Sequence, residues 1–151
     1  KIKKIGVIGA GQMGSGIAHV CALAGYEVGL NDVTRERIEA GLSTVSNNIN
    51  RQVKSGKVSE EAKNAALARI TPIDSFAGFG DHDLVIESAT ENEEVKKKIF
   101  ENLCPHVKAD AILGTNTSSI SITRLAAVTD RPEHVQGAFG KHALRHHRFR
   151  V

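Results

Sequence analysis

Several residue types are scarce in this chain of 151 residues, and each scarcity narrows the classes of protein to which it can belong. There is no tryptophan, one tyrosine, and only two cysteines, Cys21 and Cys104. Two cysteines far apart in the sequence exclude a disulfide framework and a zinc ribbon, and they fit a reducing compartment. No apolar run approaches the roughly 18 residues that a membrane span needs. The segment Lys1–Gly9 has no signal-peptide hydrophobic region, so we expect a cytoplasmic protein without a membrane anchor.

Acidic residues are absent from the end of the chain, and this location explains the formal net charge of +3. Four of the 20 basic residues lie between Lys141 and Val151, so 16 basic residues face 17 acidic ones in the part before residue 141. Nucleic-acid-binding domains carry their positive charge on a folded face, interleaved with stacking aromatics. We therefore expect no nucleic-acid partner, and we interpret residues 138–151 as an atypical basic tail.

Short β-branched runs alternate with amphipathic stretches along the first 137 residues. The expected strands are Lys4–Ile8, Glu27–Asn31, Arg69–Pro72, Asp83–Glu87 and Ala111–Thr115, with a sixth opening near Val135. The expected helices are Gln12–Ala24 closed by Gly25, a long one from the N-cap Thr34 to about Lys54, one starting at Ser59, one from about Glu93 to Leu103, and Ile122–Ala127. Strands joined by helices of this length require right-handed crossovers. The pattern predicts an α/β fold: a Rossmann-type, doubly wound, mostly parallel sheet with a helical pair inserted after the second strand.

The first turn between a strand and a helix carries the pattern G-x-G-x-x-G, formed by Gly9, Ala10, Gly11, Gln12, Met13 and Gly14. The pattern alone is weak, but here it follows a strand directly and opens a helix directly. Its first glycine permits the tight turn, its second lets a pyrophosphate approach the backbone, and its third lets helix and strand pack closely. The helix N-terminus adds free N–H groups for phosphate oxygens. A turn without ligand and an FAD-binding loop remain alternatives.

Asp32 stands at the end of the second expected strand, where a carboxylate can accept hydrogen bonds from the adenosine ribose. Its negative charge would repel a 2′-phosphate, so we expect the cofactor NAD rather than NADP. Arg35 and Arg37 could in principle receive such a phosphate, but we interpret them as solvated helix residues.

Three stretches of the chain carry a family resemblance, and the last two are far more specific than the glycine loop. They lie within Gly9–Gly16, Asp83–Lys96 and Gly114–Thr123, and the last contains Thr-Asn-Thr-Ser-Ser-Ile-Ser-Ile-Thr. Over about residues 2–137 the chain resembles the 3-hydroxyacyl-CoA dehydrogenase family, particularly its bacterial 3-hydroxybutyryl-CoA dehydrogenases. The resemblance implies an oxidoreductase of fatty-acid or butanoate metabolism that converts an (S)-3-hydroxyacyl-CoA to the 3-ketoacyl-CoA with NAD. It also implies a homodimer for the full-length enzyme and no catalytic metal.

The same resemblance assigns roles to individual residues. Glu91 and Lys96 match cofactor contacts near the nicotinamide, although a helix-entry acid and a solvated lysine would explain them locally. Ser118 matches the serine that faces both the substrate oxygen and the nicotinamide, and its alternative is a capping hydroxyl. Arg51 and Lys54 lie near positions that contact the coenzyme A part of the substrate, with a solvated helix face as the alternative.

The chain departs from the family pattern after Gly137. The family carries its catalytic histidine in a G-x-H-F-x-N-P segment about 21 residues after the serine, and that position here is Phe139. His142 is three residues out of register and lacks the supporting segment. We expect a cofactor domain over residues 1–137, an unrelated tail from a frameshift, a truncation or a tag, no C-terminal helical substrate and dimerisation domain, and a catalytically inactive chain. A 3-hydroxyacid or 6-phosphogluconate-type dehydrogenase domain and a non-catalytic NAD-binding module remain the alternative functions.

Overall fold

Strands and helices alternate along the chain in the computed structural model, which describes residues 2–116 and 122–137. The strands are β1 (Lys4–Ile8), β2 (Glu27–Asn31), β3 (Ile70–Pro72), β4 (Leu84–Glu87), β5 (Ile112–Thr115) and β6 (Val135–Gln136). The helices are α1 (Gln12–Leu23), α2 (Arg35–Lys54), α3 (Glu60–Ala68), α4 (Glu93–Leu103) and α5 (Ile122–Ala126), with two 3₁₀ helices, η1 (Phe76–Phe79) and η2 (Pro132–His134). All of these strands and α-helices match the sequence prediction to within two residues, whereas the two 3₁₀ helices are additional.

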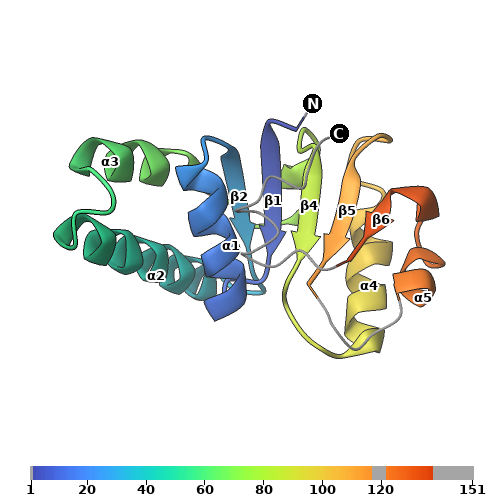
Figure 1. The fold of residues 1–151 in the computed structure, drawn as a ribbon. Coiled ribbons are helices and arrows are strands. Elements are labelled where there is room, and N and C mark those ends of the chain that lie inside the picture. The colour runs from blue at the N-terminus through green and yellow to red at the C-terminus, as the bar shows by residue number, and fades with distance from the viewer. Residues whose placement is uncertain (1, 117–121, 138–151) are drawn as a thin grey trace.

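The six strands form one sheet in the order β3-β2-β1-β4-β5-β6, and every neighbouring pair is parallel (Figure 1). The predicted Rossmann-type fold is confirmed, and the described sheet is wholly rather than mostly parallel. The chain builds β1, β2 and β3 toward one side and then returns to place β4 on the other side of β1. Open α/β sheets bind ligands at such a reversal, outside the carboxyl ends of the strands. The carboxyl ends of β1 and β4 therefore mark the expected position of a site.

Each face of the sheet has its own apolar core, because successive strand residues point to opposite faces. On β4, Leu84 and Ile86 join the cluster under α1, α2 and α3, whereas Val85 joins the cluster on the other face. That second cluster includes Phe100 and Leu103 of α4. Helices α1 to α3 thus cover one face, and α4 and α5 cover the other (Figure 1).

Local signals in the sequence fix the ends of the helices. The hydroxyls of Thr34 and Ser59 accept hydrogen bonds from the N–H groups of Arg37 and Ala62. Thr34 is therefore the predicted N-cap of α2, and Ser59, where a helix was predicted to start, is the N-cap of α3. Gly25 has a φ of 102°, the left-handed conformation that ends a helix. The helical pair α2–α3 lies between β2 and β3 as expected. None of the described helices is both long and apolar enough to cross a membrane.

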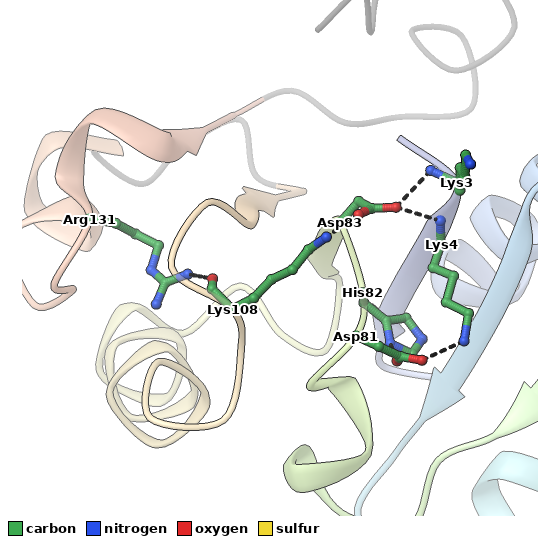
Figure 2. A network of polar contacts seen from close by, with 7 residues as sticks. All are labelled: Lys3, Lys4, Asp81, His82, Asp83, Lys108 and Arg131. Carbon is green, nitrogen blue, oxygen red and sulfur yellow. Dashed lines mark hydrogen bonds and ion pairs between the residues drawn. The ribbon is translucent and has the colours of Figure 1, made fainter. Parts of the chain in front are cut away.

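Charged groups at the amino ends of the strands satisfy one another, as Figure 2 shows. Asp83, which precedes β4, accepts hydrogen bonds from the backbone N–H groups of Lys3 and Lys4 at 2.7 and 2.9 Å and pairs with the ammonium of Lys108. Lys4 also pairs with Asp81, and Arg131 donates to the carbonyl oxygen of Lys108. Burial alone would raise the pKa of Asp83, but the hydrogen bonds from Lys108, Lys4 and Lys3 outweigh it and lower that pKa to about 2. This network, the amino-edge network, connects the starts of β1, β4 and β5.

Candidate cofactor-binding site

The glycine loop joins β1 to α1 at the carboxyl edge of the sheet, and its first and third glycines are required by the fold itself. Gly9 has a φ of 104°, and a Cβ there would lie 2.7 Å from the carbonyl carbon of Ser88. A Cβ at Gly14 would lie 1.6 Å from the carbonyl oxygen of Gly9. Both contacts are with backbone atoms, so a larger residue at either position would force the backbone to shift.

The second glycine of the loop is different, because the protein does not need it. No described heavy atom lies within 4 Å of a Cβ built at Gly11, and its φ is −70°, which any residue adopts. Gly11 is the N-cap of α1, and no described side chain forms a capping hydrogen bond there. The first turn of α1 also contains no acidic residue. The loop therefore leaves open space beside the positive end of a helix, which suits an anion.

Three neighbours hold Ala10 in the middle of the loop. Its N–H donates to Oδ2 of Asp32 at 2.8 Å, and its carbonyl oxygen accepts from the Ser15 hydroxyl at 2.9 Å. Gly41 of α2 packs so closely that a Cβ there would lie 2.8 Å from the Ala10 Cβ. Asp32 thus anchors the loop through this hydrogen bond. Gln12 and Met13, at the start of α1, are exposed.

A cleft of about 230 Å³ opens next to the loop at the carboxyl ends of β1 and β2. Its lining includes Gly9, Asp32, Val33, Asp74, Phe76 and Ala89. Asp32 is half-buried, and its Oδ1 accepts the N–H of Val33 at 2.6 Å. The structure therefore brings the predicted loop and the predicted ribose acid to one cleft.

The lysine predicted to lie near the nicotinamide is fully buried. Lys96 of α4 pairs with Glu87 at the end of β4, and neither side chain is exposed. Glu87 also accepts hydrogen bonds from the Thr115 hydroxyl at 2.8 Å and from the N–H of Ala89 at 2.7 Å. The alternative interpretation of Lys96 as a solvated lysine beside Lys97 is wrong, because α4 turns this side chain under the carboxyl edge of the sheet.

The remaining predicted site residues that the structure describes do not line the cleft. Glu91 is exposed in the loop between β4 and α4, just before Asn92, whose Oδ1 caps α4 by accepting the N–H of Val95. Arg51 and Lys54 are exposed in the last turn of α2, about 15 and 20 Å along the helix from Gly41. Helix α2 runs away from the sheet toward that end, so these two residues do not join the cleft (Figure 1). Ser118, Phe139 and His142 lie outside the described residues.

Sequence reasoning missed Glu87, Thr115, Gly41 and Asp74 as residues of this region. An acid directly after the apolar run Leu84–Ile86 is a usable signal for Glu87, because it marks the carboxyl end of a buried strand. Lys96 precedes the buried Phe100 and Leu103 by four and seven residues, which is the spacing of one helix face. Asp74 has no such signal, because its position depends on how β3 pairs with β2.

Comparison with known proteins agrees with this geometry. A sequence model of the 3-hydroxyacyl-CoA dehydrogenase NAD-binding domain matches residues 4–142. The chain belongs to this family. The predicted family is thereby confirmed, and the glycine loop, Asp32 and the cleft all fall within the matched NAD-binding domain.

Individual members of the 3-hydroxyacyl-CoA dehydrogenase family are similar in sequence and in structure. A 3-hydroxybutyryl-CoA dehydrogenase of Bradyrhizobium diazoefficiens is 58% identical over 136 residues, which are 90% of this chain and 46% of that protein. The crystal structure of (S)-3-hydroxybutyryl-CoA dehydrogenase from Ralstonia eutropha superposes with a TM-score of 0.89 at 40% identity, over 93% of this chain and 50% of that one. A 3-hydroxyadipyl-CoA dehydrogenase of Escherichia coli is 39% identical over 90% of this chain and 29% of its own length. The chain thus spans about half, or less, of the curated relatives that it matches.

Proposed function

We propose that this domain binds NAD across the carboxyl ends of β1, β2 and β4, and that it serves an NAD-dependent 3-hydroxyacyl-CoA dehydrogenase. The enzyme would interconvert a short-chain (S)-3-hydroxyacyl-CoA and its 3-ketoacyl-CoA. The observation that carries the proposal is the contrast within the glycine loop. Backbone contacts explain Gly9 and Gly14, whereas a ligand close to the backbone would explain why Gly11 has no side chain in a space that the described residues leave open.

The residues at the cleft suit the parts of NAD. The uncapped N-terminus of α1 and the open space at Gly11 fit the pyrophosphate, and Asp32 at the end of β2 fits the two hydroxyls of the adenosine ribose. Glu91 and Lys96 belong to the nicotinamide side by family position. Lys96 is buried, so it would act there through its neighbours. Its ammonium compensates the negative charge of Glu87, and Glu87 accepts the N–H of Ala89, which lies beside Gly9.

Bound NAD supplies a hydride acceptor, and the chain's residues would orient the substrate against it. By family position the Ser118 hydroxyl would hold the substrate oxygen, an effect of alignment rather than of acid strength. Arg51 and Lys54 would attract the phosphates of coenzyme A from the end of α2. The substrate's hydroxyl proton needs a general base, and in the family that base is the histidine of the segment that this chain lacks.

We propose that the 151-residue chain is for this reason inactive, or nearly so, although it binds the cofactor. Phe139 stands where the family has its histidine, and loss of a general base typically lowers turnover by about 10²–10⁴-fold. The complete enzyme would be a homodimer that uses further residues of its second half. A non-catalytic NAD-binding module remains the second candidate, and the departure after Gly137 is the observation that favours it.

Calorimetric titration tests cofactor binding. We expect NAD to bind this chain, NADP to bind much more weakly, and Asp32→Asn to weaken NAD by about tenfold, because a charged acceptor of two hydroxyls is lost. Glu61→Gln on the exposed surface of α3 is the matched control and should leave both affinities unchanged. Equal affinities of the parent chain and Asp32→Asn for NAD would overturn the assignment of the ribose site.

A substrate panel tests the reaction. NADH oxidation would be followed with acetoacetyl-CoA and with free keto acids, using this chain and a chimera in which residues 138–151 are replaced by the remaining half of the Bradyrhizobium relative. We expect acetoacetyl-CoA turnover by the chimera alone. Turnover of free acids instead would favour the 3-hydroxyacid dehydrogenase alternative. Comparable turnover by both chains would refute the inactivity of this chain and return His142 to consideration as the base.

A further inference from the structure

The adenosine end of the cleft carries a second carboxylate in addition to Asp32. Asp74 lies two residues after β3, and it lines the same cleft as Asp32 and Val33. Strand β3 pairs in parallel with β2, with Ile70 beside Val28 and Pro72 beside Leu30. The two carboxyl ends therefore lie next to each other, and each delivers an aspartate to the edge where the ribose of NAD would sit.

Arg35, three residues after Asp32, is a cation at this edge, and it already forms an ion pair. Its Nη1 lies 3.0 and 2.9 Å from the two carboxylate oxygens of Asp74, and its Nε lies 3.6 Å from Oε1 of Glu39. The hydrogen bond and charge of Asp74 raise the pKa of the Arg35 guanidinium further. Two carboxylates, those of Asp74 and Glu39, thus pair with one guanidinium. Because Asp32 lines the same cleft as Asp74, these four charged groups together are negative.

A 2′-phosphate on the adenosine ribose needs a cation at this place. In dinucleotide-binding domains an acid after the second strand favours NAD, and an arginine nearby accommodates the phosphate of NADP. Arg35 follows Asp32 by three residues and could provide such an arginine. We infer that Asp74 is a specificity-determining residue that holds Arg35 in an ion pair and so adds to the rejection of NADP by Asp32. The inference rests on the proposed NAD site and goes beyond it by naming a second residue that sets the cofactor preference.

Both partners are accessible, so the pair can be changed without disturbing the core. The side chains of Arg35 and Asp74 are 51% and 66% exposed, and exposed pairs contribute little to stability. Asp74→Asn removes the charge and releases the guanidinium but keeps the shape of the side chain. Asp74→Glu keeps the charge and serves as the conservative control.

The test is a double-mutant cycle on cofactor affinity at constant ionic strength. Dissociation constants for NAD and NADP would be measured for the parent chain, Asp74→Asn, Arg35→Gln, the double variant and Asp74→Glu. We expect Asp74→Asn to raise the affinity for NADP relative to that for NAD by about fivefold, because the gain cannot exceed the strength of the exposed ion pair that is removed. Arg35→Gln alone should change the ratio of the two affinities little. The double variant should lose the gain in NADP affinity, and Asp74→Glu should keep the parent's preference for NAD. If the parent chain binds NADP too weakly to measure, the same cycle is repeated in an Asp32→Asn background, because loss of the Asp32 charge should strengthen NADP binding.

The outcomes separate this inference from the proposed function. If NAD binds the parent chain but Asp74→Asn leaves the ratio of the two affinities unchanged in both backgrounds, the inference is wrong and the proposed function stands. A gain that persists in the double variant also overturns it, because the effect would then not pass through Arg35. If the parent chain binds neither dinucleotide, the proposed function fails and the inference fails with it.

Discussion

The two ends of the sheet use charged residues in opposite ways. At the amino ends, Asp83 receives two backbone N–H groups and the Lys108 ammonium, so the amino-edge network is satisfied within the chain. At the carboxyl ends, Gly11 and Asp32 border open space beside the start of α1. Parallel strands place all their carboxyl ends on one side, which concentrates helix N-termini there. The difference indicates that the amino edge serves stability and the carboxyl edge serves a ligand. Beneath the carboxyl edge, the buried side chains of Glu87, Lys96 and Thr115 form a layer that serves both.

The largest effect is expected from that buried layer. Lys96→Met leaves Glu87 as an unpaired charge in the core, and we expect a loss of about 3 to 5 kcal/mol in the free energy of unfolding. Denaturant unfolding measures this loss. Lys97→Met on the same helix is the matched control, because its side chain is partly exposed and its ion pairs, which are screened by water, should contribute far less.

The double variant Glu87→Gln/Lys96→Met sharpens this prediction. It removes both charges, so we expect it to recover a large part of the stability lost in Lys96→Met. A single variant as stable as the parent chain would show that the ion pair of Lys96 with Glu87 does not stabilise the fold.

The next effect separates two glycines of the same loop. Gly14→Ala places a Cβ against the Gly9 carbonyl oxygen, and relief requires α1 to move, at a cost of about 3 kcal/mol. Gly11→Ala meets open space and should change the free energy of unfolding by less than about 1 kcal/mol. Equal losses in the two variants, measured by the same denaturant titration, would contradict the distinction between fold-required and ligand-required glycines.

A smaller effect, and one that depends on pH, is expected from the amino-edge network. The pKa of Asp83 is lowered to about 2, so its charged form stabilises the fold above the unfolded-state value of 3.8, and this contribution disappears as the pH falls toward 2. Asp83→Asn should cost about 2 kcal/mol at pH 7, and the difference between parent and variant should vanish near pH 2. Unfolding curves at several pH values measure it. NAD affinity should stay unchanged at pH 7, and a loss of affinity would contradict the separation of the two edges.

The smallest effect is expected from the exposed part of the same network. The side chains of Lys4 and Asp81 are 42% and 63% exposed, so Lys4→Met should cost less than about 1 kcal/mol even though the pair raises the pKa of Lys4. Thermal unfolding of Lys4→Met beside Asp83→Asn ranks the two contacts. A larger loss in Lys4→Met would mean that its pair with Asp81, rather than Asp83, holds the start of β1.

Most of the fold could be predicted because its signals are local. The apolar stripe of α2, the cap Thr34, the helix start at Ser59 and the β-branched run of β1 depend on residues close in sequence, and the structure confirms all of them. The 3₁₀ helices η1 and η2 were missed because elements of three or four residues have no periodicity to detect.

The site could be predicted only in part, for a physical reason. Gly9, Gly14 and Asp32 belong to one strand–helix–strand unit whose geometry the spacing determines. The burial of Lys96 and the ion pair of Asp74 with Arg35 depend instead on contacts between distant segments. Spacing alone does not encode such contacts, so the local interpretation of Lys96 was wrong and Asp74 was not singled out.

One measurement tests the central claim, that the carboxyl edge is built around a ligand rather than for stability. The melting temperature of Gly11→Val would be recorded with and without NAD, beside the parent chain. We predict melting temperatures within about 5 °C of each other without NAD, because valine is a poorer N-cap than glycine but meets open space. We predict a rise with NAD in the parent alone, because a ligand at about 100 times its Kd adds about 2.7 kcal/mol of stability. A parent-like rise in Gly11→Val, or a large fall in its melting temperature without NAD, would contradict the claim.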